Sequence, residues 1–128
     1  MPNRVVHFEI EAADRQRASN FYAKAFGWQM QQMGEEMGQY VVVVTGDPKE
    51  PGGINGGIYA TPSGAAKEIN AFSCVIGVDN LDQAIASVKS AGGEVLGEKM
   101  DIPSTGTFIR CKDTEGNFFT MLQPQPMS

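Results

Sequence analysis

VVHFEIEAADRQRASNFYAKAFGW, residues 5–28, is the part of the sequence that predicts its own structure most clearly. Its first part is mostly β-branched or aromatic, which predicts a strand over residues 5–10. Asp14 offers a side-chain oxygen that can cap the start of a helix. The residues that follow at the i, i+3, i+4 and i+7 spacing of one helical face are Ala18, Phe21, Tyr22 and Ala25. Gly27 stands where a helix end favours glycine, so the stretch predicts a strand followed by an amphipathic helix.

Three more strands are predicted before residue 60. They are residues 28–32, the valine-rich YVVVVT at 40–45, and residues 54–60. The segments between them, 33–39 and 46–53, are rich in glycine, proline and polar side chains, as turns and loops are. The first half of the chain therefore has the order βαβββ.

The second half repeats this order. A strand is predicted over residues 70–78, and Asn80 can cap the helix that follows. The apolar positions of that helix are Leu81, Ala84, Ile85, Val88 and Ala91. Three strands come after it, at 94–100, 107–112 and 117–123, with the turn Asp113–Gly116 before the last.

An internal repeat accounts for this order. A shift of 66 residues (80 − 14) places Asp14 on Asn80 and Gly27 on Gly93. Such identities are few and involve common residue types, so the repeated order of elements is the stronger indication. We predict one domain, 1–128, whose pseudo-repeats are about 4–60 and 69–123, joined by a linker at 61–68.

The amino-acid composition limits the kinds of protein that this chain can be. The chain has 128 residues, 41% of them hydrophobic, and a formal net charge of −5 without a block of like charge. This favours one ordinary domain and argues against a nucleic-acid groove or a membrane-surface patch. Two cysteines, Cys74 and Cys111, lie in apolar runs and are predicted to be buried free thiols, with a disulfide as the minor alternative. No signal pattern or membrane-length apolar run is visible, so a soluble cytoplasmic location is expected.

Aromatic residues near the first helix are predicted to fill the core. Tyr22, Phe26 and Trp28 are placed between helix and sheet rather than on a base-stacking platform.

Strand alternation sorts the polar side chains onto one face. If Phe8 and Ile10, together with Val6, face the helix, then His7 and Glu9 face the other way. The same alternation places on the corresponding faces of the other strands Asn55, Gly57, Tyr59, Ser73, Phe118 and Thr120. Each βαβββ unit covers only one face of its sheet, so two units can bury their bare faces around a cavity, the natural place for a ligand.

Several segments together resemble one family. VVHFEI, FYAKAFGW, GGINGGI, VDNLDQAIASVKSAGGEV and DTEGNFFTM resemble, in order and spacing, the vicinal-oxygen-chelate superfamily of glyoxalases, bleomycin-resistance proteins and dioxygenases. The resemblance covers nearly the whole chain and is nearest to the small glyoxalase-like members. It implies an α+β fold of two βαβββ modules whose curved sheets surround a cavity, a small-molecule ligand and a homodimer. In some relatives the halves pair between chains, and this alternative stays open.

Most of the metal-ligand positions that the resemblance implies lack an imidazole or carboxylate side chain. His7 stands where the family has a ligand histidine, but the other three positions correspond to Gly57, Ser73 and Thr120. A divalent ion needs several imidazole or carboxylate donors at once, and hydroxyls are weak ligands. We therefore expect no metal cofactor, with a non-standard metal site as the alternative.

Three functions remain open at this point. The first is a metal-free cavity that binds a small organic ligand. The second is a lyase, isomerase, epimerase or dioxygenase that uses His7 with Glu9 as a base and its orienting carboxylate, or as ligands of an unusual metal site. The third is an interaction or structural protein whose cavity has no function. Arg110 could pair with an anionic ligand, although a surface or interface role is the simpler interpretation. The residues name no substrate.

Overall fold

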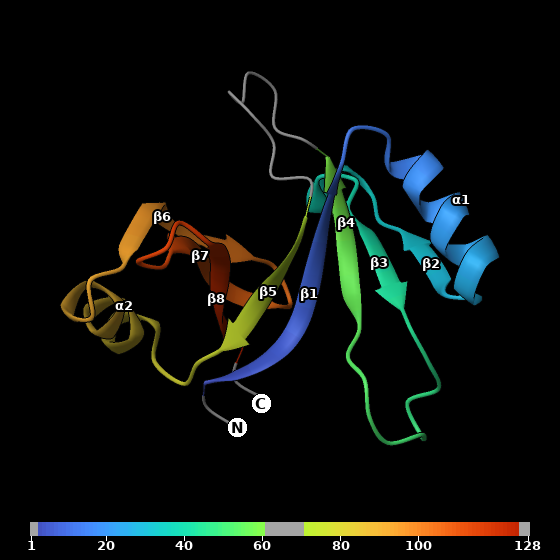
Figure 1. Ribbon diagram of the computed structural model, residues 1–128. Coiled ribbons are helices and arrows are strands. Elements are labelled where there is room, and N and C mark those ends of the chain that lie inside the picture. Colours follow the sequence, from blue (N-terminus) through green and yellow to red (C-terminus); the bar gives the residue numbers. More distant parts are fainter. Residues whose placement is uncertain (1–2, 61–70, 126–128) are drawn as a thin grey trace. The chain divides into compact units, whose positions relative to one another are not determined.

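The structure is a computed structural model that describes residues 3–60 and 71–125. The chain divides into two compact units (Figure 1). The N-terminal unit is His7–Phe72, and the C-terminal unit combines Met1–Val6 with Ser73–Ser128. The predicted linker, 61–68, lies outside the described residues.

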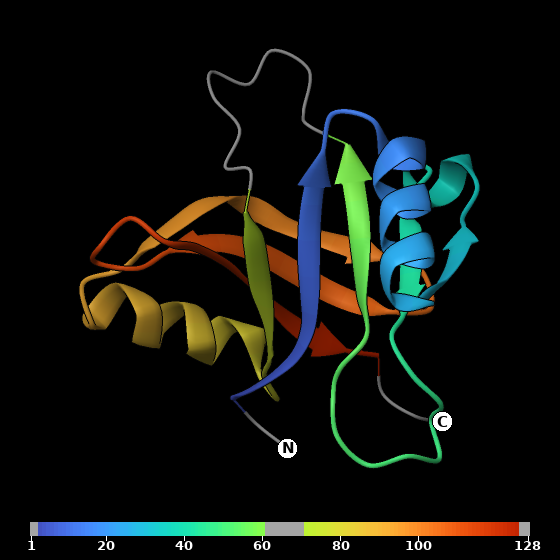
Figure 2. The same ribbon diagram turned by 45° about the vertical axis from the view of Figure 1, so that its right-hand side comes forward.

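The N-terminal unit is a four-stranded sheet with one long helix. Its elements are β1 (Arg4–Ala12, which begins in the other unit), α1 (Arg15–Phe26), β2 (Gln29–Gln32), the short 3₁₀ helix η1 (Glu35–Met37), β3 (Val41–Val44) and β4 (Gly56–Ala60). The strand order is β2-β3-β4-β1. β1 and β4 are parallel neighbours (Figure 2), whereas β2–β3 and β3–β4 are antiparallel.

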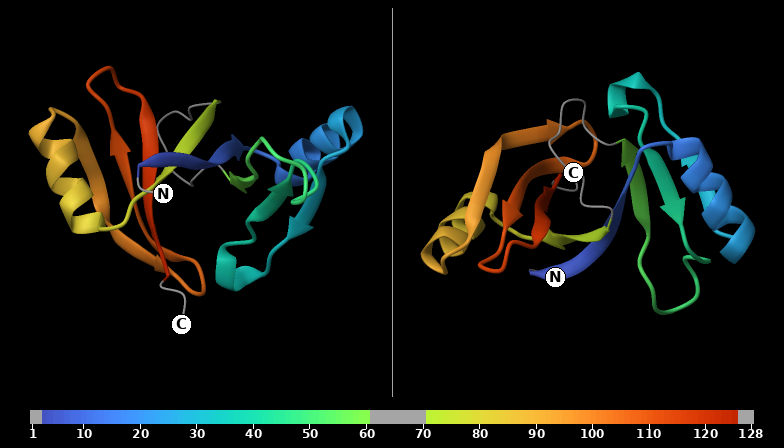
Figure 3. Two further views of the ribbon diagram at one scale, coloured as in Figure 1. Left: turned by 90° about the horizontal axis from the view of Figure 1, so that it is seen from below. Right: turned by 45° about the horizontal axis from the view of Figure 1, so that its top comes forward.

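The C-terminal unit has the same plan. Its elements are β5 (Phe72–Gly77), α2 (Leu81–Ser90), β6 (Glu94–Ile102), β7 (Gly106–Lys112) and β8 (Phe118–Pro124). The strand order is β5-β8-β7-β6, again with one parallel pair, β5–β8, and α2 lies along this sheet (Figure 3). The predicted α+β fold with two βαβββ modules is confirmed.

The helix ends follow the predicted capping residues. The Asp14 carboxylate accepts a hydrogen bond from the Arg17 backbone N–H at 2.9 Å, and the Asn80 side chain accepts one from Gln83 at 3.0 Å. Gly27 ends α1 in the left-handed conformation, with φ of 74°.

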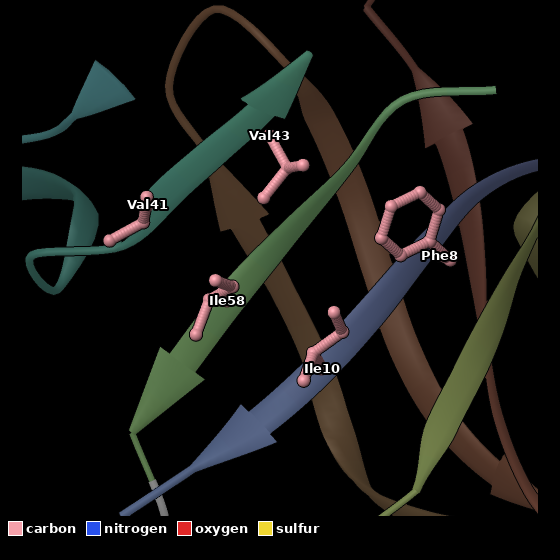
Figure 4. Close-up of a cluster of buried hydrophobic side chains, with 5 residues drawn as sticks. All are labelled: Phe8, Ile10, Val41, Val43 and Ile58. Atoms are coloured by element: carbon pink, nitrogen blue, oxygen red, sulfur yellow. The ribbon is translucent and has the colours of Figure 1, made fainter. Parts of the chain in front are cut away.

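The core of the N-terminal unit lies between its sheet and α1. Its buried residues come from three neighbouring strands and project to one side of the sheet (Figure 4): Phe8, Ile10, Val41, Val43 and Ile58. Ala18, Tyr22, Trp28 and Met30 pack against them. The predicted orientation of Phe8 and Ile10 is confirmed, but Val6 is 43% exposed, because β1 enters the N-terminal unit only at His7.

The inner face of α1 is rotated from the predicted one. Ser19 is the buried residue of the helix, and Phe21, Ala25 and Phe26 are exposed. Tyr22 does enter the core and stacks on Trp28, with ring centroids 5.2 Å apart. The prediction was wrong for Phe21, Ala25 and Phe26, because α1 turns Ala18, Ser19 and Tyr22 toward the sheet and approaches it on the small side chains of the first two.

The core of the C-terminal unit lies under α2. It contains Val78, Leu81, Ile109, Cys111 and Met121. Both cysteines are free thiols, but only Cys111 is buried, so the prediction was wrong for the exposed Cys74. Among the described residues, no helix is long and apolar enough to cross a membrane.

Candidate functional site

The polar residues of the N-terminal unit gather on the sheet face opposite α1. Because Phe8 and Ile10 point toward the helix, alternation turns His7, Glu9 and Glu11 of β1 to the other side. In the parallel β1–β4 pairing, Glu9 lies beside Gly57 and Glu11 beside Tyr59. We call this surface the β1–β4 polar face; it comprises His7, Glu9, Glu11, Gly57 and Tyr59, and Tyr40, the residue before β3, reaches it.

A tyrosine connects the imidazole to a carboxylate. The His7 Nε2 atom lies 2.9 Å from the Tyr40 hydroxyl, and that hydroxyl donates to Glu9 Oε2 at 3.2 Å. The phenol has a single proton, so while it donates to Glu9 it can only accept from His7. This assigns the Nε2–H tautomer to a neutral His7 and leaves Nδ1 as a hydrogen-bond acceptor.

Burial keeps the imidazole and the phenol of this chain uncharged. Desolvation lowers the pKa of His7 from its ordinary value of 6.5. Burial, followed by the charge of Glu9 and the hydrogen bond to it, raises the pKa of Tyr40 well above its usual range. At neutral pH the face therefore offers a neutral base beside a neutral phenol.

Tyr40 fills the space above Gly57. A Cβ added at Gly57 would overlap the hydroxyl and ring of Tyr40. The absence of a side chain at Gly57 thus leaves the space that the tyrosine occupies, and a larger residue there would have to displace the Tyr40 ring. The space at the position where the resemblance implies a metal donor is filled instead by the phenol of Tyr40, the residue before β3.

The turn before β3 holds Tyr40 in place. Arg15, in the first turn of α1, donates from Nη1 to the carbonyls of Gly38 at 3.0 Å and Gln39 at 2.8 Å. The Gln32 amide donates to the same Gln39 carbonyl at 2.7 Å. Gln39 has a positive φ of 55°, an uncommon conformation for a residue other than glycine, and these contacts fix it directly before Tyr40.

A second phenol–carboxylate pair lies further along the same strands. The Tyr59 hydroxyl donates to Glu11 Oε1 at 3.1 Å. Glu11 is only 9% exposed, and its other oxygen, Oε2, is buried without a hydrogen-bond partner. A buried carboxylate oxygen is seldom left unpaired, so this atom is an unmet acceptor of the face.

The structure brings together four of the predicted site residues: His7, Glu9, Gly57 and Tyr59. Asn55 precedes β4, and its amide oxygen accepts from the Thr45 backbone N–H at 3.0 Å, which holds the loop. Sequence reasoning missed Tyr40 and Glu11. Strand alternation could have identified both residues. Glu11 is two residues beyond Glu9 and so lies on the same face, and Tyr40 directly precedes Val41, which faces the helix.

The remaining predicted residues belong to the C-terminal unit, on the sheet face opposite α2. Ser73 and Thr120 are buried. The Phe118 ring lies near two cations, with the Arg110 guanidinium carbon 5.6 Å and the Lys112 Nζ 5.2 Å from its centroid. In the register of β7 with β8, Arg110 pairs with Thr120 and Lys112 with Phe118, so two cations and an aromatic ring share this face with Glu94, the β6 neighbour of Lys112.

The donors present do not suit a divalent metal ion. Gly57 has no side chain, and Ser73 and Thr120 offer neutral hydroxyls. Across residues 3–60 and 71–125, no group of three or more His, Cys, Asp or Glu side chains is arranged to hold a metal. The metal site that the resemblance implies therefore does not fit these residues.

Comparisons with solved structures identify the fold. Methylmalonyl-CoA epimerase from Mycobacterium tuberculosis aligns over 95% of this chain and 88% of its own, with a TM-score of 0.70 and 15% identity. The hypothetical protein BH1468 from Bacillus halodurans aligns over 100% of this chain and 99% of its own, with a TM-score of 0.72 and 11% identity. At these identities the likeness concerns the fold alone.

Sequence comparisons identify the family. The proteins named "Putative glyoxylase CFP32" of Mycobacterium bovis and Mycobacterium tuberculosis are 32% identical over 107 residues, or 83% of this chain. The matched region spans only 38% of the length of those relatives. The family model described as Glyoxalase/Bleomycin resistance protein/Dioxygenase superfamily matches residues 4–121. The resemblance inferred from the sequence motifs is thereby confirmed, and the chain belongs to the glyoxalase/bleomycin resistance protein/dioxygenase superfamily.

Proposed function

We propose that this protein binds a small organic ligand at the β1–β4 polar face and does so without a divalent metal ion on His7. The observation that carries the proposal is the Tyr40 hydroxyl, which lies over Gly57 and is hydrogen-bonded to both His7 and Glu9. A phenol with a raised pKa is a poor metal ligand, because a metal is bound by the deprotonated form.

The composition of the face supports ligand binding. Small-molecule sites combine apolar walls with a few convergent polar groups. Val42 of β3 pairs with Gly57 and lies on this side of the sheet, where His7 and Tyr40 are half-buried. The face therefore has the mixed lining that ligand sites share.

Metal content tests the metal-free part of the proposal. Wild-type protein and the His7→Gln variant are dialysed against Zn²⁺, Ni²⁺, Mn²⁺ and Fe²⁺ in turn, and bound metal is measured by mass spectrometry. We expect equal and clearly substoichiometric metal in both proteins. One equivalent in the wild type that is lost in His7→Gln would contradict the proposal.

Fragment binding tests the ligand-binding part. Because the chain has one histidine, its ring resonances report on this face without ambiguity. A library of small organic fragments is screened by NMR, and we expect the strongest binders to shift the His7 resonances and to bind more weakly to Tyr40→Phe. If the binders perturb only residues elsewhere, the proposed location is wrong.

A second candidate function is acid–base catalysis by a lyase or isomerase. The open Nδ1 of a neutral imidazole, oriented through Tyr40 by Glu9, favours it, and the glyoxylase name of the 32% identical relative points to the same kind of chemistry. A general base contributes roughly 10²- to 10⁴-fold to a rate. Any turnover by the wild type should therefore fall by about that factor in His7→Gln, and an unchanged rate rules this function out.

Assembly and location complete the proposal. The family resemblance supports a homodimer, and the sequence supports a cytoplasmic location. Sedimentation equilibrium of the purified chain tests the first, and a single monomeric species across the accessible concentrations would contradict it. Cell fractionation tests the second.

A further inference from the structure

We propose that the ligand of the β1–β4 polar face is an organic cation, a protonated amine, which Glu11 and Glu9 bind through its N–H groups and charge. The inference rests on the proposed ligand-binding function and specifies the chemical class of the ligand.

The hydrogen-bond donors of the face are already used within it. The Tyr40 proton is donated to Glu9, and the Tyr59 proton is donated to Glu11. With Tyr40 donating to Glu9, the His7 Nε2–H is donated to Tyr40. A ligand that needs donors finds none left among these three side chains.

Acceptors remain open on the same face. Glu11 Oε2 is buried without a hydrogen-bond partner, and the residue as a whole is only 9% exposed. The Nδ1 atom of neutral His7 carries a lone pair. An unpaired buried carboxylate oxygen is costly, so a ligand that brings an N–H to it gains more than a ligand that brings another acceptor.

The charge of the face favours a cation. Glu9 and Glu11 are two residues apart on one side of β1, which places their Cα atoms about 6.6 Å apart at the usual rise of a strand. Within the described part of the chain, no lysine or arginine forms an ion pair with Glu11. An ammonium group bound at Glu11 would be attracted by the charge of this carboxylate, whereas a ligand carboxylate or phosphate would be repelled by it.

Two aromatic rings flank these carboxylates. Tyr40 lies over Gly57, the neighbour of Glu9, and Tyr59 is the neighbour of Glu11 in the same register. The faces of phenol rings attract cations, and the attraction grows when the cation is shielded from water. Carboxylates beside aromatic rings therefore favour an amine over a neutral alcohol of the same shape.

The test compares three probes that share one ring: benzylammonium, benzyl alcohol and benzoate. Each is titrated into ¹⁵N-labelled full-length protein at neutral pH, and backbone amide shifts are followed. We expect benzylammonium to bind most tightly and to shift residues 9–12 and 57–60. The Glu11→Gln variant keeps the shape but loses the charge, so its affinity for benzylammonium should fall about tenfold, equivalent to about 1.4 kcal/mol. Glu98→Gln, an exposed site in β6, is the matched control and should bind as the wild type does.

The outcomes separate this inference from the proposed function. If benzoate or benzyl alcohol binds these residues as tightly as benzylammonium, or if Glu11→Gln leaves the benzylammonium affinity unchanged, the cation class is wrong while ligand binding stands. If benzylammonium shifts no residue of the face, the inference is also overturned, and the fragment screen decides the proposed function independently. If Glu11→Gln loses its dispersed spectrum, Glu9→Gln replaces it, with a loss of affinity expected and an unchanged affinity again contradicting the inference.

Discussion

The two units of this protein share a plan but differ in the sheet face opposite the helix. In the N-terminal unit that face carries an imidazole, two phenols and two carboxylates, linked by hydrogen bonds through Tyr40 and Tyr59. In the C-terminal unit it carries hydroxyls and the Phe118 ring, which lies beside Arg110 and Lys112. One face is built on phenol–carboxylate hydrogen bonds, and the other places cations beside an aromatic ring. The repeat therefore preserves the order of elements and leaves the chemistry of each face free to diverge.

The preserved features are those that folding requires. Both helices begin at a side-chain cap, and both sheets pair their first and last strands in parallel. Each unit buries one apolar sheet face under its helix. A one-residue slip of register would expose that set of side chains, so this burial fixes the register of the strands. The opposite faces are under no such constraint, so they are where function can differ.

The largest expected effect comes from breaking the core of one unit. Ile58 is fully buried between β4 and α1, so Ile58→Ala should lower the free energy of unfolding by about 2–5 kcal/mol. Ile54, just before β4 and 37% exposed, is the matched control, and Ile54→Ala should cost no more than about 0.5 kcal/mol. Urea unfolding measures both. Equal losses would show that the assigned core is wrong.

A smaller effect tests the close approach of Tyr40 to Gly57. Gly57→Ala places a methyl group where the phenol lies and should cost about 1–3 kcal/mol, since an overfilled site must shift its neighbours. Gly46, which has open space around its Cα, is the control, and Gly46→Ala should be close to neutral.

The double variant Tyr40→Ala/Gly57→Ala sharpens this test. Removing the ring removes the overlap, so the added cost of Gly57→Ala should largely disappear in the Tyr40→Ala background. A double-mutant cycle measures the difference. Additive costs would mean that Tyr40 does not occupy this space.

The helix caps should behave alike in the two units. Asp14→Ala and Asn80→Ala each remove one side-chain bond to a backbone N–H, and each should cost about 0.5–2 kcal/mol. Asp14→Asn and Asn80→Asp keep a capping oxygen and serve as controls. A cost at only one cap, measured by urea unfolding, would break the proposed equivalence of the two helices.

The smallest effect is a pH dependence specific to the N-terminal unit. Burial lowers the pKa of His7 from 6.5, so the unfolded chain takes up a proton at this residue at a higher pH than the folded chain. The free energy of unfolding therefore decreases as the pH falls through 6.5, by at most about 1.4 kcal/mol per pH unit. It levels off below the pKa that His7 has in the folded chain. Unfolding of wild type and His7→Gln is compared from about pH 7.5 to about pH 5.5. Parallel curves would contradict the lowered pKa.

The sequence predicts the fold well because local patterns and burial agree. The parity of Phe8 and Ile10, the two capping residues and the repeated order of elements each specify a feature that the structure contains. The exposure of Phe21 and Phe26 was not predictable from periodicity, because residue spacing does not reveal which of two overlapping stripes faces the sheet.

The site is predicted less completely for a physical reason. His7, Glu9, Gly57 and Tyr59 follow from strand parity, but the reach of Tyr40 over Gly57 depends on the pairing of β3 with β4 and on the turn that Arg15 holds. These are tertiary contacts between segments far apart in the sequence. A glycine at a ligand position signals a missing donor, and only the structure identifies the side chain that takes its space.

The protonation of the two His7 ring nitrogens shows whether this imidazole is held by Tyr40 or binds a metal ion. The ¹⁵N shifts of its two ring nitrogens are measured at neutral pH before and after one equivalent of Zn²⁺ is added. We expect a protonated Nε2 and an unprotonated Nδ1, both unchanged by zinc, with the preference for this tautomer weakened in Tyr40→Phe. A ring nitrogen that shifts in step with one equivalent of zinc would show that the imidazole holds a metal and would contradict the account.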